Sequence, residues 1–200
     1  MRIIGGKYRG RKLKSPPTVR TRPTSDRLRE ALFNILAPRI EGARFLDLCA
    51  GTGAVGIEAL SRGAAQVTFV DKSRTMCALI EANLWPLQVE KERYVVITSE
   101  AAAFLRNLSK VGAPSLTVGL LPRSATAFDL VFFDPPYAAD YEAVLELFGE
   151  HDAKLLSEDA PVIVEHHKKK DLAEEFEGLK RYRELRQGDS VLSFYRAGSQ

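Results

Sequence analysis

Residues 45–56 read Phe45-Leu46-Asp47-Leu48-Cys49-Ala50-Gly51-Thr52-Gly53-Ala54-Val55-Gly56. An apolar run leads into three glycines with the spacing Gly-x-Gly-x-x-Gly, and small and apolar residues follow. This segment is typical of a buried strand that turns through glycines into a helix, at the carboxyl edge of a parallel sheet. The sequence therefore predicts an open α/β fold that holds a ligand at this turn.

The rest of the chain extends this pattern. From Ala43 onward, apolar runs alternate with amphipathic stretches, as in a mostly parallel, doubly wound sheet. Near the C-terminus, the turn Gln187-Gly188-Asp189-Ser190 predicts an antiparallel hairpin that closes the sheet edge. The expected strands cover residues 44–49, 66–71, 93–98, 128–133 and 161–166, and the hairpin covers 180–186 and 191–196.

Residues 1–24 are predicted to form a separate basic β-hairpin and connector ahead of a main domain at 25–200. Ile3-Ile4-Gly5-Gly6 and Arg11-Lys12-Leu13-Lys14 flank a polar turn that contains glycine, and a proline-rich stretch continues to Pro23. Short apolar and basic runs around such a turn indicate a hairpin.

A helix is expected after this connector, and a long loop is expected later in the chain. Thr24-Ser25-Asp26 offers N-cap oxygens, apolar residues follow at helical spacing, and Pro38 is predicted to end the helix. Residues 109–127 are rich in Gly, Pro, Ser and Thr, which indicates a loop. It is interpreted either as a lid over a substrate or as a neutral surface insertion.

The composition describes one domain of α/β size. The chain has 200 residues, 45% of them hydrophobic, and no apolar run approaches the roughly 20 residues that span a bilayer. The basic start lacks the features of a secretion signal, so a cytoplasmic location is expected. Cys49 and Cys77 are expected to be reduced, and neither they nor the adjacent His166 and His167 predict a metal site.

The net charge of +3 is distributed unevenly. Residues 1–30 hold ten Lys or Arg against two acids, whereas the remaining 170 hold nineteen against twenty-four. A basic segment on an acidic body is what binding to a phosphate backbone requires, although a solvated flexible tail is the alternative. The basic run 166–170 is interpreted as a solvated helix start, with contact to RNA as the alternative. The predicted RNA-binding residues are Arg2, Lys7, Arg9, Arg11, Lys12, Lys14, Arg20 and Arg22.

The glycine loop by itself fits two ligands. Asp71 lies twenty residues after Gly51, where a dinucleotide fold places its ribose-binding acid. Asp47 favours the other ligand, S-adenosylmethionine, because an acid beside the turn suits an ammonium group and disfavours a pyrophosphate. In the alternative structural interpretation, Asp47 pins the loop and Asp71 caps the next helix at Ser73. Gly51 and Gly53 complete this predicted cofactor site.

The end of the third expected strand adds two candidates to the cofactor site. Glu100 and Ala101 open a helix at the sheet edge where ligands bind in open α/β folds. Glu100 is interpreted either as an acceptor for the adenine amino group or as an acid that stabilises the helix dipole.

Asp134-Pro135-Pro136-Tyr137, directly after the apolar run 130–133, predicts the chemistry. An amino group on a conjugated ring or a carboxamide is a poor nucleophile, because its lone pair is delocalised. The Asp134 carboxylate and the Pro135 carbonyl are able to accept both of its N–H bonds and favour a tetrahedral nitrogen. Tyr137 is then placed to stack on the base. The alternative is an ordinary turn that ends a buried strand.

In this order and spacing, the motifs make the chain similar to class I S-adenosylmethionine-dependent methyltransferases. Three further segments point to one family within this class. They are the N-terminal Met1-Arg2-Ile3-Ile4-Gly5-Gly6, the run Arg22-Pro23-Thr24 followed by the helix residues 29–36, and the C-terminal segment 188–195. Together they resemble the bacterial RsmD family, whose members methylate the N2 amine of a guanine in the helix 31 loop of 16S ribosomal RNA.

The resemblance implies a seven-stranded sheet of the Rossmann-like methyltransferase type with an N-terminal hairpin extension, acting as a monomer on 16S rRNA. It also implies cofactor contacts from Asp47, Gly51, Gly53 and Asp71, with catalysis at 134–137. The chain departs from the family pattern at Glu100, where the family has Asp, and in the longer 109–127 loop. The rivals are methylation of adenine N6 or a glutamine amide, a non-catalytic RNA-binding module, and a nucleotide-dependent oxidoreductase.

Overall fold

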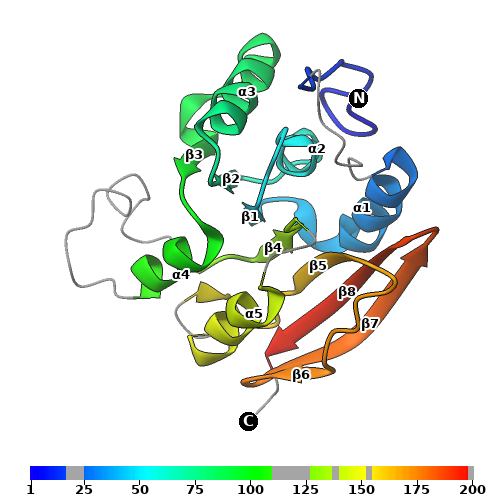
Figure 1. The fold of residues 1–200 in the computed structure, drawn as a ribbon. Coiled ribbons are helices and arrows are strands. Elements are labelled where there is room, and N and C mark those ends of the chain that lie inside the picture. Colours follow the sequence, from blue (N-terminus) through cyan, green and yellow to red (C-terminus); the bar gives the residue numbers. More distant parts are fainter. Residues whose placement is uncertain (17–24, 110–126, 137–139, 152–154, 198–200) are drawn as a thin grey trace.

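The computed structural model describes residues 1–16, 25–109, 127–136, 140–151 and 155–197. One sheet forms the centre of the molecule, with the strand order β3-β2-β1-β4-β5-β8-β7-β6 (Figure 1). Strands β1 to β5 are parallel to their neighbours, and β8 pairs with β5 in antiparallel orientation. The predicted doubly wound α/β fold is therefore confirmed.

The elements lie close to the predicted ranges. The helices are α1 (Asp26–Ile40), α2 (Ala54–Ser61), α3 (Arg74–Leu84), α4 (Ala101–Ser109) and α5 (Tyr141–Glu150), and two 3-10 turns are η1 (Trp85–Leu87) and η2 (Lys91–Arg93). The strands are β1 (Arg44–Leu48), β2 (Gln66–Asp71), β3 (Tyr94–Thr98), β4 (Leu130–Phe133), β5 (Val162–His167), β6 (Glu175–Phe176), β7 (Leu179–Gln187) and β8 (Ser190–Ala197).

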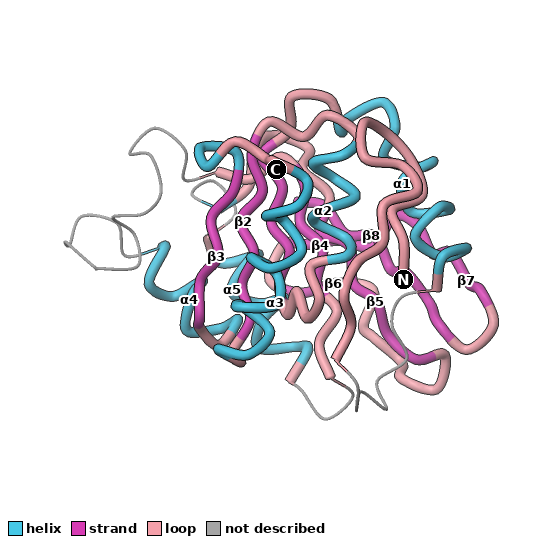
Figure 2. Tube along the Cα trace, turned by 90° about the horizontal axis from the view of Figure 1, so that it is seen from above, coloured by secondary structure: helices cyan, strands magenta, loops and turns pink. Residues whose placement is uncertain are grey.

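Helices flank the sheet and enclose a separate core on each face (Figures 1 and 2). Ile57 of α2 and Ile80 of α3 pack with Phe132 on one face. Phe104 of α4 packs with Phe133 on the other. Successive strand residues enter opposite cores, since side chains alternate across a strand. This alternation decides which face receives each side chain at the strand ends.

The predicted strand count and the predicted end of the first helix need correction. In the described part of the chain the sheet has eight strands and not seven, because two residues of β6 add a short edge beside β7. Helix α1 contains Pro38 and continues to Ile40. Pro38 lies in the last turn, where the carbonyl that loses its partner belongs to the exposed Asn34 and stays accessible to water. The buried Ile40 side chain then holds the final residues against the core.

The N-terminal segment is a hairpin with very little strand pairing. Its arms are joined by one bridge, between Arg2 and Lys12, and by the Ile3 and Leu13 N–H groups, which donate to the carbonyls of Arg11 and Met1 at 3.0 Å each. Figure 2 draws the segment as loop. The predicted hairpin is therefore present, and it is also bonded to helix α2. The Ile4 and Gly5 N–H groups donate to the Glu58 carboxylate at 2.8 and 2.7 Å, and the Tyr8 N–H donates to Ser61 Oγ at 2.9 Å.

Other predictions meet the limits of the described residues. Residues 17–24 of the connector and 110–126 of the expected loop lie outside them. Within the described ranges, none of the helices has the length and apolar character needed to cross a membrane. Cys49 and Cys77 are free thiols. The run 166–170 does not start a helix, because His166 and His167 belong to β5 and a turn follows.

Candidate active site at the carboxyl edge of the sheet

The glycine loop between β1 and α2 needs its glycines for different reasons. Gly51 and Gly53 have φ of +54° and +74°, a region in which side chains are strained. Gly56 has no such φ, but a Cβ there would meet the Phe69 ring at 2.3 Å. The first two glycines shape the turn, and the third allows α2 to pack closely on β2.

Asp47 and Asp71 hold this loop through backbone amides. Asp47 Oδ2 accepts from the Gly56 N–H at 2.9 Å, within the first turn of α2. Asp71 Oδ2 accepts from Gly51 and Oδ1 accepts from Ser73, at 2.9 and 2.8 Å. The alternative interpretation, that these acids pin the loop, thus describes their contacts correctly. A carboxylate has about four acceptor positions, so these bonds leave capacity for a ligand.

Burial makes Asp47 costly to ionise. Its side chain is only 2% exposed, and desolvation raises its pKa to about 7, against the opposing bond from Gly56. The charge on Asp71 adds to the increase. A cation bound nearby would favour the ionised form, so this position is suited to a positively charged ligand.

Cys49 shows how closely the predicted acids gather. It follows β1 with φ of +60°, an unusual backbone conformation for a residue with a side chain. Burial raises the pKa of its thiol to about 12, and the charges of four carboxylates add to this effect. These are Asp71, Asp134, Asp47 and Glu100. Four acids predicted separately from the sequence therefore act on one point at the sheet edge.

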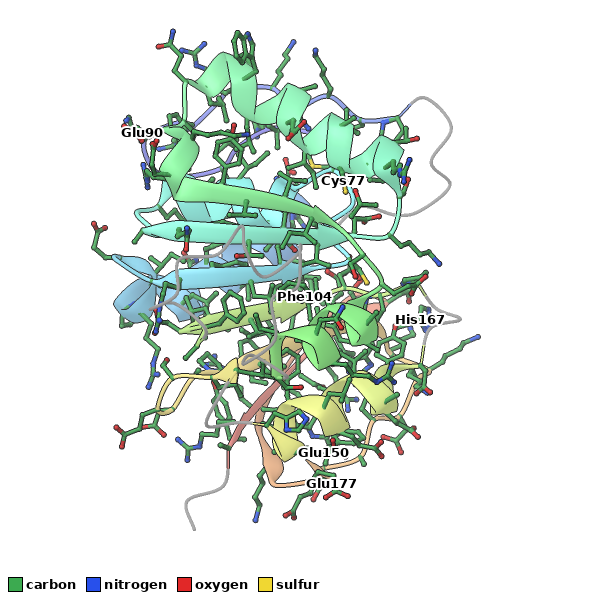
Figure 3. All side chains as sticks on the ribbon, turned by 90° about the vertical axis from the view of Figure 1, so that its left-hand side faces the viewer. Cys77, Glu90, Phe104, Glu150, His167 and Glu177 are labelled. Atoms are coloured by element: carbon green, nitrogen blue, oxygen red, sulfur yellow. The ribbon has the colours of Figure 1, made fainter. Side chains whose placement is uncertain are left out.

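The described acids lie at the carboxyl ends of four different strands. In Figure 3, Glu90, which precedes β3, lies at one end of the parallel strands, and His167, which ends β5, lies at the other end. The end with His167 is the carboxyl edge of the sheet. Glu100 is exposed there, at the start of α4, and Ala101 beside it is 9% exposed. Within the described ranges, no group of three or more His, Cys, Asp or Glu is arranged to hold a metal ion.

Asp134 and Pro135 continue directly from β4. The Asp134 N–H donates to the Leu48 carbonyl at 3.3 Å, so the backbone still follows β1 at this point. Burial raises the pKa of Asp134 well above its ordinary value, and the charges of Glu165 and Asp47 add to it. The Pro135 carbonyl accepts from the Tyr141 hydroxyl at 3.4 Å. Tyr137 lies outside the described residues.

Comparison with known proteins identifies the family. A family model described as Conserved hypothetical protein 95 matches residues 1–196. The Haemophilus influenzae protein named Ribosomal RNA small subunit methyltransferase D is 36% identical over 173 residues, 86% of this chain and 81% of that one. The Escherichia coli protein of the same name is 42% identical over 137 residues, 68% of this chain and 60% of that one. The chain belongs to the RsmD family.

A solved structure extends the likeness to the whole RsmD-family chain. It is described as "Putative methyltransferase yhhF from Escherichia coli", with a TM-score of 0.80 and 32% sequence identity. The match covers 100% of this chain and 99% of that one. The Rossmann-like architecture inferred from the glycine loop is therefore shared by a relative along its full length.

The N-terminal hairpin of this RsmD-family chain lies beside the glycine loop. Figure 1 shows it between α1 and α3, next to α2. Asn83 of α3 joins the two structures, since its Nδ2 donates to the carbonyls of Lys14 and Thr52 at 3.2 and 3.1 Å. Six of the eight predicted RNA-binding cations are exposed on this hairpin, and Arg20 and Arg22 lie outside the described residues. The six are Arg2, Lys7, Arg9, Arg11, Lys12 and Lys14.

Sequence reasoning missed four residues that support the site. Glu58 and Asn83 dock the hairpin, Tyr141 bonds the Pro135 carbonyl, and Glu165 lies beside Asp134. Glu58 and Asn83 carry a signal in hindsight, because each is a polar residue at a core position of a helix pattern. Glu165 carries the same signal, as an acid within the apolar run of β5.

Proposed function

We propose that this RsmD-family protein transfers a methyl group from S-adenosylmethionine to the exocyclic N2 of a guanine in small-subunit ribosomal RNA, at the helix 31 loop. The observation that carries the proposal is the convergence of Asp47, Asp71, Glu100 and Asp134 around Cys49. The methyl donor has an ammonium and a sulfonium group and no phosphate, whereas a dinucleotide brings anionic phosphates to the glycine loop. An acidic edge favours the former.

The residues of the site have distinct proposed roles. Asp47 and Asp71 both hold the glycine loop. Asp47 faces the ammonium group of the donor, and Asp71 faces its ribose hydroxyls. When bound, S-adenosylmethionine supplies an electrophilic methyl group on a sulfonium. Asp134 and the Pro135 carbonyl accept the two N–H bonds of the guanine amine and hold its nitrogen in line with that methyl. Tyr137 stacks on the base. As the N–C bond forms, the bond between the sulfonium and the methyl group breaks, and its electron pair stays on the sulfur of the departing thioether, S-adenosylhomocysteine. The amine loses one proton, which Asp134 is placed to accept.

The Tyr141 hydroxyl supports the role proposed for Pro135. It is buried, and it bonds the carbonyl from the protein side. A carbonyl oxygen has two lone pairs, so one remains for the substrate amine. The bond fixes the carbonyl direction before the substrate arrives, which is what positioning catalysis requires.

The hairpin is the proposed RNA grip. Its exposed cations lie on a segment that is bonded to α2 and α3 and, through Asn83, to the glycine loop. RNA phosphates would therefore be held at a fixed distance from the donor. We expect these contacts to position the RNA, while the acceptors at 134–137 select the base. The protein is proposed to act as a monomer in the cytoplasm, where bacterial ribosomal subunits are assembled.

Methyl transfer from S-adenosylmethionine labelled with tritium in its methyl group tests the proposal. The acceptors, in parallel, are 16S rRNA, small ribosomal subunits lacking this modification, DNA and a protein mixture, and labelled RNA is digested to nucleosides. The expected product is N2-methylguanosine from the rRNA or the subunits. Label in N6-methyladenosine or in protein would contradict the guanine assignment, and no label in any acceptor would contradict the enzymatic one. Calorimetry against NAD tests the oxidoreductase alternative.

A further inference from the structure

Glu165 and Asp134 lie side by side on neighbouring strands. Strands β4 and β5 are paired in parallel as far as Phe133 opposite Val164, so the next pair in this register is Asp134 opposite Glu165. Glu165 is 7% exposed. In each strand the residue two positions earlier, Phe132 or Ile163, belongs to the same core. The alternation of side chains therefore places both carboxylates on the same face of the sheet.

The electrostatics agree with this placement. The charge on Glu165 is the largest electrostatic contribution that raises the pKa of Asp134, after burial. Two adjacent carboxylates repel each other, and here one is half-buried and the other buried. The roles proposed so far for Asp134 and Pro135 do not include Glu165.

Counting donors and acceptors suggests a ligand that uses all three groups. The Asp134 carboxylate, the Pro135 carbonyl and the Glu165 carboxylate are acceptors at the same ends of two adjacent strands. The Watson–Crick edge of guanine has three N–H donors in a row, one on N1 and two on the N2 amine. Adenine and cytosine offer two donors beside an acceptor, and a glutamine amide does the same. Of these candidates, only guanine supplies a donor for every acceptor.

We propose that Glu165 is a specificity-determining residue, which accepts a hydrogen bond from the guanine N1–H while Asp134 and Pro135 accept from the N2 amine. This inference rests on the proposed function, and it explains why that site selects guanine. A base with an acceptor at N1 would face the Glu165 carboxylate with lone pair against lone pair. Other hydrogen bonds made by Glu165 within the protein are compatible with this role, because a carboxylate accepts at several positions.

The test compares guanine with 2-aminopurine at the target position of the RNA, in reconstituted small subunits. The analogue keeps the N2 amine but has an acceptor at N1. The wild-type protein should methylate guanine about 10- to 100-fold faster, because the analogue leaves a charged acceptor without its donor. In Glu165→Gln the ratio should approach one, since the Gln amide is able to donate to the N1 acceptor. Glu165→Ala should also lose the preference and should methylate guanine more slowly.

Matched controls separate the outcomes. Asp129→Asn removes a carboxylate that pairs with Arg44 at the opposite end of β4, and it should keep the wild-type ratio. Donor affinity and thermal unfolding are measured for each variant, and Glu165→Asp, which withdraws the carboxylate by one methylene, replaces any variant that fails to fold. An unchanged ratio in the Glu165 variants, or equal wild-type rates on both bases, overturns the inference. No N2-methylguanosine from the wild-type protein with guanine RNA would instead overturn the proposed function.

Discussion

The side chain of Asn83 donates to the Thr52 carbonyl at 3.1 Å and thereby ties helix α3 to the glycine loop. The same carboxamide accepts from the Lys14 N–H at 2.7 Å and donates to the Lys14 carbonyl at 3.2 Å. One buried side chain thus connects the basic hairpin to the loop proposed to hold the methyl donor. We infer that Asn83 fixes the position of the proposed RNA-binding hairpin relative to the proposed donor-binding loop.

Asn83→Ala should therefore weaken both the fold and donor binding. The change removes the partner of the Lys14 N–H and of the Lys14 and Thr52 carbonyls, in bonds that are partly buried. We expect the free energy of unfolding to fall by about 2–4 kcal/mol. Urea denaturation and calorimetry with S-adenosylmethionine measure the two effects. Asn83→Asp, the matched variant, keeps the acceptor for Lys14 but has no donor for Thr52, so it should retain part of the stability. Wild-type values for both quantities in Asn83→Ala would contradict this role.

Glu58→Ala should destabilise the docked hairpin more strongly. The Glu58 carboxylate accepts from Ile4, Gly5 and the Arg62 side chain, and it lies 3.8 Å from Nε of Arg29, which is 1% exposed. Among the described residues, its removal leaves the Arg29 guanidinium with the partly exposed Asp26 as ion-pair partner and the Arg2 carbonyl as a neutral acceptor.

We expect Glu58→Ala to lower the free energy of unfolding by about 3–5 kcal/mol, as for broken buried ion pairs. Proteolysis at the Lys and Arg residues of positions 1–16 should accelerate. Glu58→Gln keeps an acceptor and should lose less. Equal proteolysis rates in the wild-type and Ala proteins would show that Glu58 does not hold the hairpin.

Asp47→Asn should make the protein more stable at high pH and weaken donor binding. The Asp47 pKa is raised to about 7 in the folded protein, so folding favours the protonated acid. Its contribution to stability is complete below pH ~4, the pKa of the unfolded chain, and is lost as the pH rises through about 7.

Asparagine removes this titration and can still accept from Gly56. At pH 8 the variant should gain stability, by ~4 kcal/mol at most, and the difference should vanish near pH 4. Urea denaturation across this pH range tests the first effect, and calorimetry tests the donor affinity. A variant that is less stable than the wild type at pH 8 would contradict the cost assigned to this buried charge.

Asp134→Ala should lower methyl transfer by a factor of about 10²–10³ while donor affinity stays nearly unchanged. Asp134→Asn keeps an oxygen acceptor and should retain more activity. Because burial and Glu165 raise the pKa of Asp134, the carboxylate forms only at higher pH, so the wild-type rate should increase with pH. The rate of the Asn variant should be flat over the same range. Unaltered turnover in Asp134→Ala would eliminate the role proposed for this residue.

Replacing hairpin cations should weaken RNA binding and its dependence on salt. Deletion of residues 1–14 is a poor test, because Ile3, Tyr8 and Leu13 are part of the core. Substitution of the exposed Arg9, Arg11 and Lys12 lowers the charge of the hairpin and leaves this packing in place. Their joint substitution by Ala should reduce the slope of log K against log salt by about 2, at roughly 0.7 per contact with single-stranded RNA. Substitution of the exposed Lys180 in β7, away from the hairpin, serves as the control.

The local patterns of the sequence were sufficient for most of the architecture. Gly51, Gly53 and Gly56 predicted the turn, because a positive φ at the first two and close packing at the third exclude most residues with a side chain. The apolar runs predicted β1 to β5 to within about two residues. These features depend on neighbours in the chain, and so they can be read from it. Pro38 was misinterpreted, because its effect depends on how the following Ile40 packs against distant residues.

The tertiary structure decided which polar groups meet. Asp47, Asp71, Glu100 and Asp134 were recognisable as candidates, but their convergence on Cys49 follows from the strand order, which brings β1, β2, β3 and β4 to one edge. The docking of the hairpin by Glu58 and Asn83 joins residues more than fifty positions apart. The proximity of Glu165 to Asp134 likewise depends on the register of β4 and β5. Contacts between distant segments arise from packing of the whole chain, so no local pattern encodes them.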